Sequence, residues 1–216
     1  MKIKTVFFDI DGLLIDSEKA FNICWRQAGE ETGYPLTLEQ SYRLRSMDHK
    51  LAAAFFTELF GDEKAYSAVR VRRQDLMKEY NRTHPLELKK GAREILSYLK
   101  DKGYDTAVVT SSQKERARSY LSEVELQDSF TKIISADLIS RGKPYPDIYL
   151  FACEAQGVKA EECIAIEDSP NGLKSAHDAG CHTIMIPDLT PYDEEVAPYV
   201  EWHFDSLFDV IGSGIL

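Results

Sequence analysis

The sequence has no uninterrupted apolar run of about 18 residues, which is the length that a membrane-spanning helix requires. It also has no apolar leader segment, because Met1, Lys2 and Ile3 run directly into a short β-rich stretch. We therefore predict that the chain has no signal peptide, does not interact with membranes and is cytoplasmic.

Cysteine is scarce, and positive charge is not in excess. The four cysteines are scattered and form no C-x-x-C pair, which disfavours a disulfide framework or a zinc site. The chain has 26 basic and 36 acidic residues and a net charge of −10, whereas a nucleic-acid-binding protein needs a basic surface. The 44% of hydrophobic residues is ordinary for a globular protein. We expect a monomer that does not bind nucleic acid.

The pattern of apolar residues changes along the chain. Between residues 18 and 80 the spacing is helical, with Asp16 and Ser17 as the cap of the first helix, and no good strand run occurs. From residue 92 onward, short β-rich runs alternate with amphipathic helices, which is typical of a parallel sheet. The predicted strands are Thr5–Phe8, Thr106–Val109, Lys132–Ser135, Cys163–Ile166 and His182–Ile186. The predicted helices after residue 90 are Ala92–Lys102, Gln113–Glu123, Asp147–Gln156, Gly172–Asp178 and Leu207–Ile211.

This alternation predicts an α/β fold with a doubly wound parallel sheet. We assign residues 1–15 and 86–216 to a catalytic core that contains the sheet. Residues 16–85 form an α-helical cap domain that is inserted after the first strand.

Two carboxylates follow the first predicted strand. Asp9 and Asp11 lie two residues apart, so an extended chain places them on the same side, and Gly12 allows the backbone to turn immediately afterwards. Two carboxylates this close repel each other unless a cation lies between them. The pair is therefore a candidate metal site, or a candidate nucleophile with a neighbouring proton donor. The alternative is an ordinary solvated Asp-Gly turn.

Polar side chains also follow three later strands, at Thr110 and Ser111, at Lys143, and at Glu167 and Asp168. Each has a structural alternative, namely a helix cap, a solvated lysine and an acidic turn. Ligands of parallel sheets bind beyond the carboxyl ends of the strands, so we expect these groups to meet in one crevice.

The charges of these groups predict their roles. Carboxylates suit Mg²⁺, whereas a hydroxyl and a lysine suit a phosphate group. Asp9 is then both nucleophile and metal ligand, and Asp11 is the group that protonates the leaving oxygen and activates water.

Four motifs resemble those of the haloacid dehalogenase superfamily, in the branch with a helical cap that includes β-phosphoglucomutase-like and phosphoglycolate-phosphatase-like enzymes. They are DIDG (residues 9–12), VVTSS (108–112), GKPYPD (142–147) and IEDSPNG (166–172), and they occur in the family order. The resemblance implies a Rossmann-like core and a phosphorylated aspartate as intermediate. It also implies Mg²⁺ held by the Asp9 side chain, the Asp11 carbonyl and Asp168, with Glu167 assisting through the water shell. Thr110 and Lys143 would hold the phosphate.

The segment from Tyr42 to Lys50 is the predicted recognition loop of the cap. We expect Arg45 and His49 in this loop, together with Ser111 of the core, to contact the substrate. The alternative is a solvated connection between helices. The predicted substrate is a small phosphorylated metabolite.

Three function classes stay open: a Mg²⁺-dependent phosphatase, a phosphosugar mutase and a non-catalytic protein with the same fold. The mutase relatives carry a histidine and an arginine where this chain has Phe21 and His49, which favours the phosphatase, although Arg43 or Arg45 can replace the missing arginine. No catalytic element is missing, which disfavours a non-catalytic protein. Carbon–halogen hydrolysis requires neither Asp11 nor a metal site, so it is the least favoured reaction.

Overall fold

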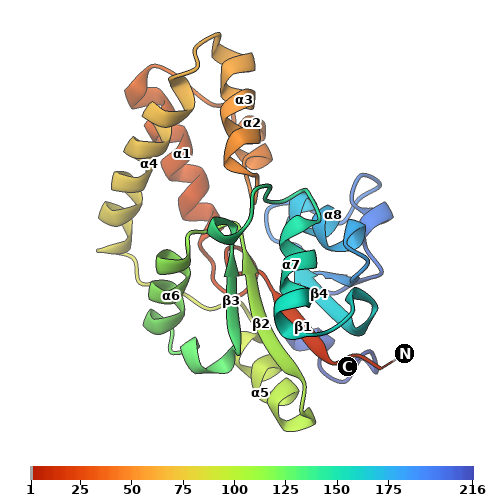
Figure 1. Cartoon of the computed structure of the whole chain (residues 1–216). Helices are drawn as coiled ribbons and strands as arrows, with labels where there is room; N and C mark the ends of the chain where they lie inside the picture. Colours follow the sequence, from red (N-terminus) through yellow and green to blue (C-terminus); the bar gives the residue numbers. More distant parts are fainter. Residues whose placement is uncertain (1) are drawn as a thin grey trace.

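A computed structural model describes residues 2–216. Within these residues, six strands form one sheet in the order β3-β2-β1-β4-β5-β6, and every pair of neighbours is parallel (Figure 1). The strands are β1 (Thr5–Phe8), β2 (Asp105–Thr110), β3 (Lys132–Ser135), β4 (Cys163–Glu167), β5 (His182–Met185) and β6 (Trp202–His203). Strand β1 lies between β2 and β4, so the ends of these three strands are adjacent.

Helices cover both faces of the sheet. They are α5 (Ala92–Lys102), α6 (Lys114–Glu123), α7 (Asp147–Gln156), α8 (Pro170–Asp178) and α9 (Leu207–Val210). Alternation along β1 directs Val6 and Phe8 to the face covered by α5, α6 and α9, and Phe7 to the face covered by α7 and α8. Both faces are therefore buried, and the predicted doubly wound α/β fold is confirmed.

Apart from shifts of one residue at the ends of β2, β4, β5, α6 and α9, the local structure differs from the sequence prediction at three places. Helix α8 begins at Pro170, two residues early, because proline suits the first helical turn and the Ser169 side chain accepts from the Gly172 N–H. Strand β6 was not predicted, since Trp202 and His203 are too short a run to give an alternating pattern. Ser17 precedes the first helix, but its side chain makes no capping hydrogen bond.

Four helices form the inserted segment: α1 (Glu18–Thr32), α2 (Leu38–Arg43), α3 (His49–Phe60) and α4 (Ala65–Asn81). They enclose an apolar cluster of their own and lie beyond the ends of β1 and β2 (Figure 1). The two connections to the core are paired, because the Asp16 N–H donates to Glu87 and the Lys89 N–H donates to Leu14. The exact boundaries at residues 15/16 and 85/86 stay a prediction.

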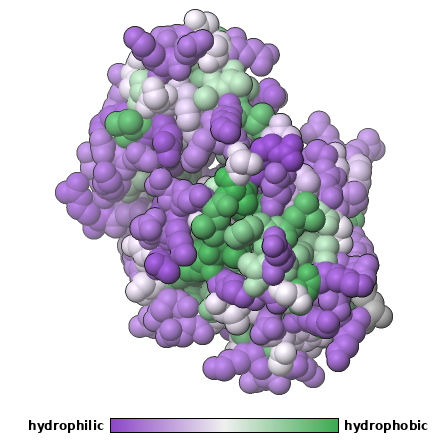
Figure 2. Space-filling view, in the orientation of Figure 1, coloured by the Kyte–Doolittle hydropathy of each residue, from purple (hydrophilic) through white to green (hydrophobic). Residues whose placement is uncertain are grey.

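Hydrophilic residues cover most of the cap surface on the face shown in Figure 2, and apolar residues gather on the core over β3 and α7. No helix within residues 2–216 is both long enough and apolar enough to cross a membrane.

Candidate active site

Lys143 lies at the centre of the strand-end groups. Its fully buried ammonium group is 2.6 Å from Asp9 Oδ1, 2.6 Å from Glu167 Oε1 and 3.0 Å from the Val109 carbonyl oxygen. Burial disfavours its charge, but the two carboxylates outweigh burial and raise the pKa of Lys143 above its usual range. The lysine is therefore charged and connects groups from the ends of β1, β2 and β4.

Three buried carboxylates gather beside this lysine. Oxygens of Asp9, Glu167 and Asp168 lie within 4.8 Å of one another. Burial is the main cause that raises the pKa of each group, to about 7 for Glu167. Asp9 Oδ2, Glu167 Oε2 and both Asp168 oxygens have no hydrogen-bond partner among residues 2–216. Unsatisfied carboxylate oxygens at this spacing fit a hard cation such as Mg²⁺.

Two glycines allow this close approach. Gly12 has φ +87°, and a Cβ there would come within 2.5 Å of Asp168 Oδ2. A Cβ at Gly172 would overlap the Glu167 carboxylate. The glycines of the DIDG and IEDSPNG motifs therefore leave room for the carboxylates, in addition to shaping turns.

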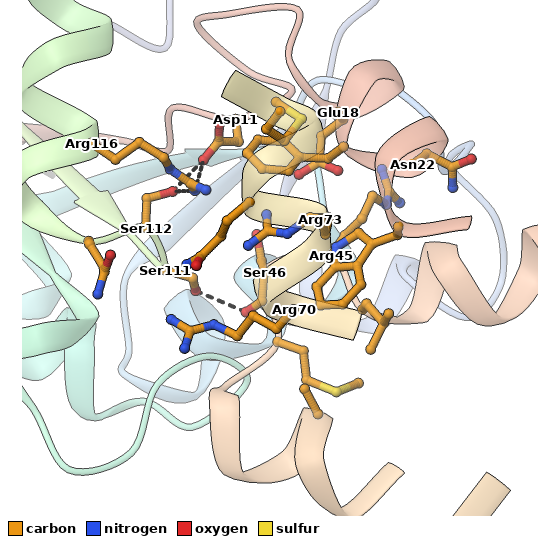
Figure 3. Close-up of a pocket in the computed structure, with 18 of the residues that line it drawn as sticks. Asp11, Glu18, Asn22, Arg45, Ser46, Arg70, Arg73, Ser111, Ser112 and Arg116 are labelled. Carbon is orange, nitrogen blue, oxygen red and sulfur yellow. Dashed lines mark hydrogen bonds and ion pairs between the residues drawn. The ribbon is translucent and has the colours of Figure 1, made fainter. Parts of the chain in front are cut away.

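The Asp11 carboxylate is held by three donors. The Ser17 hydroxyl donates to Oδ1 at 2.7 Å, the Ser112 hydroxyl donates to Oδ2, and Arg116 on α6 donates to Oδ2 at 3.0 Å. The sequence did not assign these roles, and the expected cap residue Ser17 acts on Asp11 instead. Asp11 is thus fixed at the wall of the cavity between core and cap (Figure 3).

Thr110 and Ser111 lie side by side after β2 but have different contacts. Thr110 is buried, lines the cavity and accepts from the Ser112 N–H at 3.0 Å. The Ser111 hydroxyl donates at 2.9 Å to the carbonyl oxygen of Ser46 in the cap loop (Figure 3). Ser111 therefore connects core to cap in this structure.

The cap loop meets the core at two further points. The Asp48 side chain accepts from the Gly142 N–H at 2.9 Å, and the Asp48 N–H donates to the Lys143 carbonyl at 2.8 Å. Arg45 is buried, with Nη1 3.5 Å from Asp168 Oδ2, and its carbonyl accepts from Asn171 at 2.8 Å. The loop thus contacts the residues around three of the four motifs.

A cavity of about 480 Å³ lies between cap and core. Its floor, on the core side, includes Asp9, Asp11 and Thr110, and the cap contributes His49. Arg73 of α4, which the sequence analysis did not predict, also lines the cavity (Figure 3). His49 is 2.8 Å from the hydroxyl of Tyr66. Arg73 occupies a position on the apolar stripe of α4, between Val69 and Met77. A charged residue within an apolar helical stripe was the one indication in the sequence that Arg73 is a candidate functional residue.

A family model described as haloacid dehalogenase-like hydrolase matches residues 6–186. The chain belongs to this family. It is 30% identical over 205 residues to hexitol phosphatase A of Escherichia coli, covering 91% of this chain and 89% of that protein. It is 26% identical over 197 residues to β-phosphoglucomutase of Bacillus subtilis, covering 88% and 85%. A hydrolase structure from Pseudomonas syringae covers 97% of both chains with a TM-score of 0.87 at 20% identity, which shows the shared fold.

The predictions of the family and of a hydrolase are therefore confirmed. The structure brings Asp9, Asp11, Thr110 and Lys143 together, with Glu167 and Asp168 beside them. It places Arg45 and His49 on the cap side of the same cavity. The individual roles of these residues stay predictions.

Proposed function

We propose that the chain is a Mg²⁺-dependent phosphatase that hydrolyses a small phosphorylated metabolite through a phosphorylated Asp9. The observation that carries this proposal is the position of Asp9, in the floor of the cavity under the cap and 2.6 Å from Lys143. A nucleophilic carboxylate beside a buried cation is suited to attack on a phosphate dianion, because the cation offsets the repulsion between the two. The similarity to hexitol phosphatase A supports the same reaction class.

Asp9, Glu167 and Asp168 would hold the metal, together with the Asp11 carbonyl that the family resemblance implies. When bound, Mg²⁺ neutralises the carboxylates and polarises the phosphate oxygens.

The protein's own residues then divide the chemistry between them. An oxygen of Asp9 attacks phosphorus, and the bond from phosphorus to the leaving alcohol breaks while Asp11 gives its proton to the leaving oxygen. In the second step, Asp11 takes a proton from a water molecule that attacks the same phosphorus, which releases inorganic phosphate and restores Asp9. Lys143 and Thr110 bind the phosphate oxygens during both steps. The donors from Ser17, Ser112 and Arg116 orient Asp11.

Two cap residues favour a phosphatase over a phosphosugar mutase. Phe21 lines the cavity where the mutase relatives carry a histidine, and a phenyl ring neither donates a proton nor accepts one. Partial desolvation, and next the like charge of Arg70, lowers the pKa of His49, so this residue does not supply the permanent positive charge of the arginine in the mutase relatives.

The arginines of the cap loop do not take the place of the missing mutase arginine in this structure. Arg43 is exposed and lies 4.8 Å above the Phe55 ring, and Arg45 is turned toward Asp168. Water is then the expected acceptor of the phosphoryl group on Asp9.

The test is product analysis with β-glucose 1-phosphate and a catalytic amount of glucose 1,6-bisphosphate, in parallel with a panel of phosphomonoesters. We expect inorganic phosphate as the main product from at least one monoester, and no glucose 6-phosphate from the first mixture. The Asp9→Asn variant in the same assays controls for contaminating phosphatases. Efficient isomerisation with little release of phosphate would replace the phosphatase by the mutase.

A further inference from the structure

Helix α4 carries two kinds of arginine. Arg72 faces outward, where it forms ion pairs with Glu31 and, at 3.8 Å, with Glu79. Arg70 and Arg73 are three residues apart, so they share one face of the helix, and both line the cavity. Neither makes a hydrogen bond or an ion pair with any residue in the range 2–216, although the chain has a net charge of −10.

Arg73 is the more unusual of the two. It is only 7% exposed, and its guanidinium group contacts two aromatic rings, at 5.1 Å from the centroid of Phe21 and 4.8 Å from that of Trp25. Burial, and next the like charge of Arg116, lowers the pKa of Arg73 to about 10, so the side chain still carries its charge at neutral pH. A buried cation without a counter-charge is costly, and the aromatic contacts offset only part of that cost.

Arg116 extends the positive region to the floor of the cavity. Its guanidinium group lies 4.6 Å from the same Phe21 ring and donates to Asp11 at 3.0 Å. Figure 3 shows Arg70, Arg73 and Arg116 around one cavity, reaching it from α4 and α6. The Nε atoms of all three are buried and have no partner among the described residues. Arg70 and Arg73 thus keep donors available on the cap side of the cavity, whereas Arg116 also holds Asp11 on the core side.

We propose that Arg73, together with Arg70, binds a second anionic group of the substrate, a carboxylate or a phosphate remote from the phosphoryl group that Asp9 accepts. This inference rests on the proposed phosphatase function. The site is distinct from the position of His49 in the cap loop, because Arg70 and Arg73 belong to helix α4. Planar guanidinium groups bind carboxylate and phosphate oxygens with paired hydrogen bonds, which gives selectivity for an oxyanion.

The test compares substrates that differ only in the second charge. The pair of sorbitol 6-phosphate and 6-phosphogluconate differs by a carboxylate, and the pair of fructose 6-phosphate and fructose 1,6-bisphosphate differs by a phosphate. In at least one pair, we expect kcat/KM to be roughly 10- to 100-fold higher for the substrate that carries the second anionic group. Arg73→Gln is expected to reduce this ratio to near one. Arg72→Gln, a change on the same helix outside the cavity, is the matched control and is expected to keep the ratio.

Binding to the Asp9→Asn variant, measured by calorimetry, separates this inference from the phosphatase function. Tighter binding of the more highly charged member, lost when Arg73→Gln is added, supports the site even where no phosphate is released. A failure of the wild-type protein to release phosphate from any monoester counts against the phosphatase alone. Equal Kd values within both pairs, or a preference that survives Arg73→Gln, would overturn the proposed site.

Discussion

On the floor of the cavity, Lys143 lies 2.6 Å from the carboxylates of both Asp9 and Glu167, whereas on the cap side Arg73 lies over the rings of Phe21 and Trp25 and forms no ion pair with any of residues 2–216. Both cations are buried. The floor therefore contains its own counter-charges, which hold the catalytic groups in place before a substrate arrives. On the cap side, Arg70 and Arg73 have no such partners among residues 2–216, and we propose that a ligand supplies the counter-charge.

The largest expected effect comes from neutralising the nucleophile. Asp9→Asn is expected to reduce kcat by roughly 10³-fold or more, because an amide attacks phosphorus poorly. The fold is expected to survive, since the change is nearly isosteric and removes a buried negative charge. Phosphate release and thermal unfolding measure the two effects, with the exposed Asp128→Asn as control. Substantial turnover by pure Asp9→Asn would rule out the assignment.

Removal of the metal is expected to abolish turnover as well. EDTA should stop phosphate release, Mg²⁺ should restore it, and Ca²⁺ should support it poorly because a larger ion misplaces the reacting groups. Saturating Mg²⁺ should also stabilise the folded state, by about 2.7 kcal/mol at 100 times its Kd. Asp168→Asn should weaken this stabilisation. Full activity after rigorous removal of metal would contradict the proposed site.

Loss of the cation on the floor is expected to destabilise the fold. Lys143→Met leaves the carboxylates of Asp9 and Glu167 without their ion pair, at a cost of about 3 kcal/mol in the free energy of unfolding at pH 8. The loss should be smaller at pH 5, where the carboxylates take up protons, and the double variant with Asp9→Asn should recover part of it. Urea denaturation without metal measures both effects. A wild-type midpoint for Lys143→Met would show that the floor is not held together by these ion pairs.

Glu18 lines the same cavity and tests how strongly its buried carboxylates repel one another. Burial, and next repulsion by Asp11, raises the pKa of Glu18 to about 8 in the folded state. An acid whose pKa is higher when folded lowers stability as pH rises above its unfolded value of about 4.3, until the pH exceeds the folded value. Glu18→Gln should therefore stabilise the metal-free protein by several kcal/mol at pH 8.5 and by nothing near pH 4. A gain that does not change with pH would point to altered packing instead.

The two sides of the cavity also differ in how well the sequence predicts them. The floor residues follow β1, β2 and β4 directly or lie in recognisable motifs, and parallel strands bring their ends to one edge of the sheet. The order of elements in the core therefore predicted that Asp9, Thr110 and Asp168 lie close together. Strand β6 escaped prediction because two residues carry no periodicity.

The cap side could not be predicted in the same way. The positions of Arg70 and Arg73 in the cavity depend on how α4 is oriented about its axis and on how the cap sits over the core. Neither the orientation of a helix nor the placement of the cap can be predicted from a local sequence pattern. The contacts of Ser17 and Ser112 with Asp11 could not be predicted either, because they join segments that become neighbours only after folding. Ser17 also fits a local role as a helix cap, so the sequence pattern gave no indication of its contact with Asp11.

The smallest expected effect is also the one that separates the two sides of the cavity most directly. Arg73→Met keeps a long apolar side chain against Phe21 and Trp25 but removes the uncompensated charge. In the absence of ligand it should stabilise the protein by about 1 kcal/mol, a change opposite in sign to that of Lys143→Met. Arg72→Met, which loses only exposed ion pairs, should cost at most about 0.5 kcal/mol. Urea denaturation of the three variants at one pH provides the comparison. If Arg73→Met destabilises the protein as strongly as Lys143→Met does, a group within the protein compensates the charge of Arg73, and no ligand is needed for that purpose.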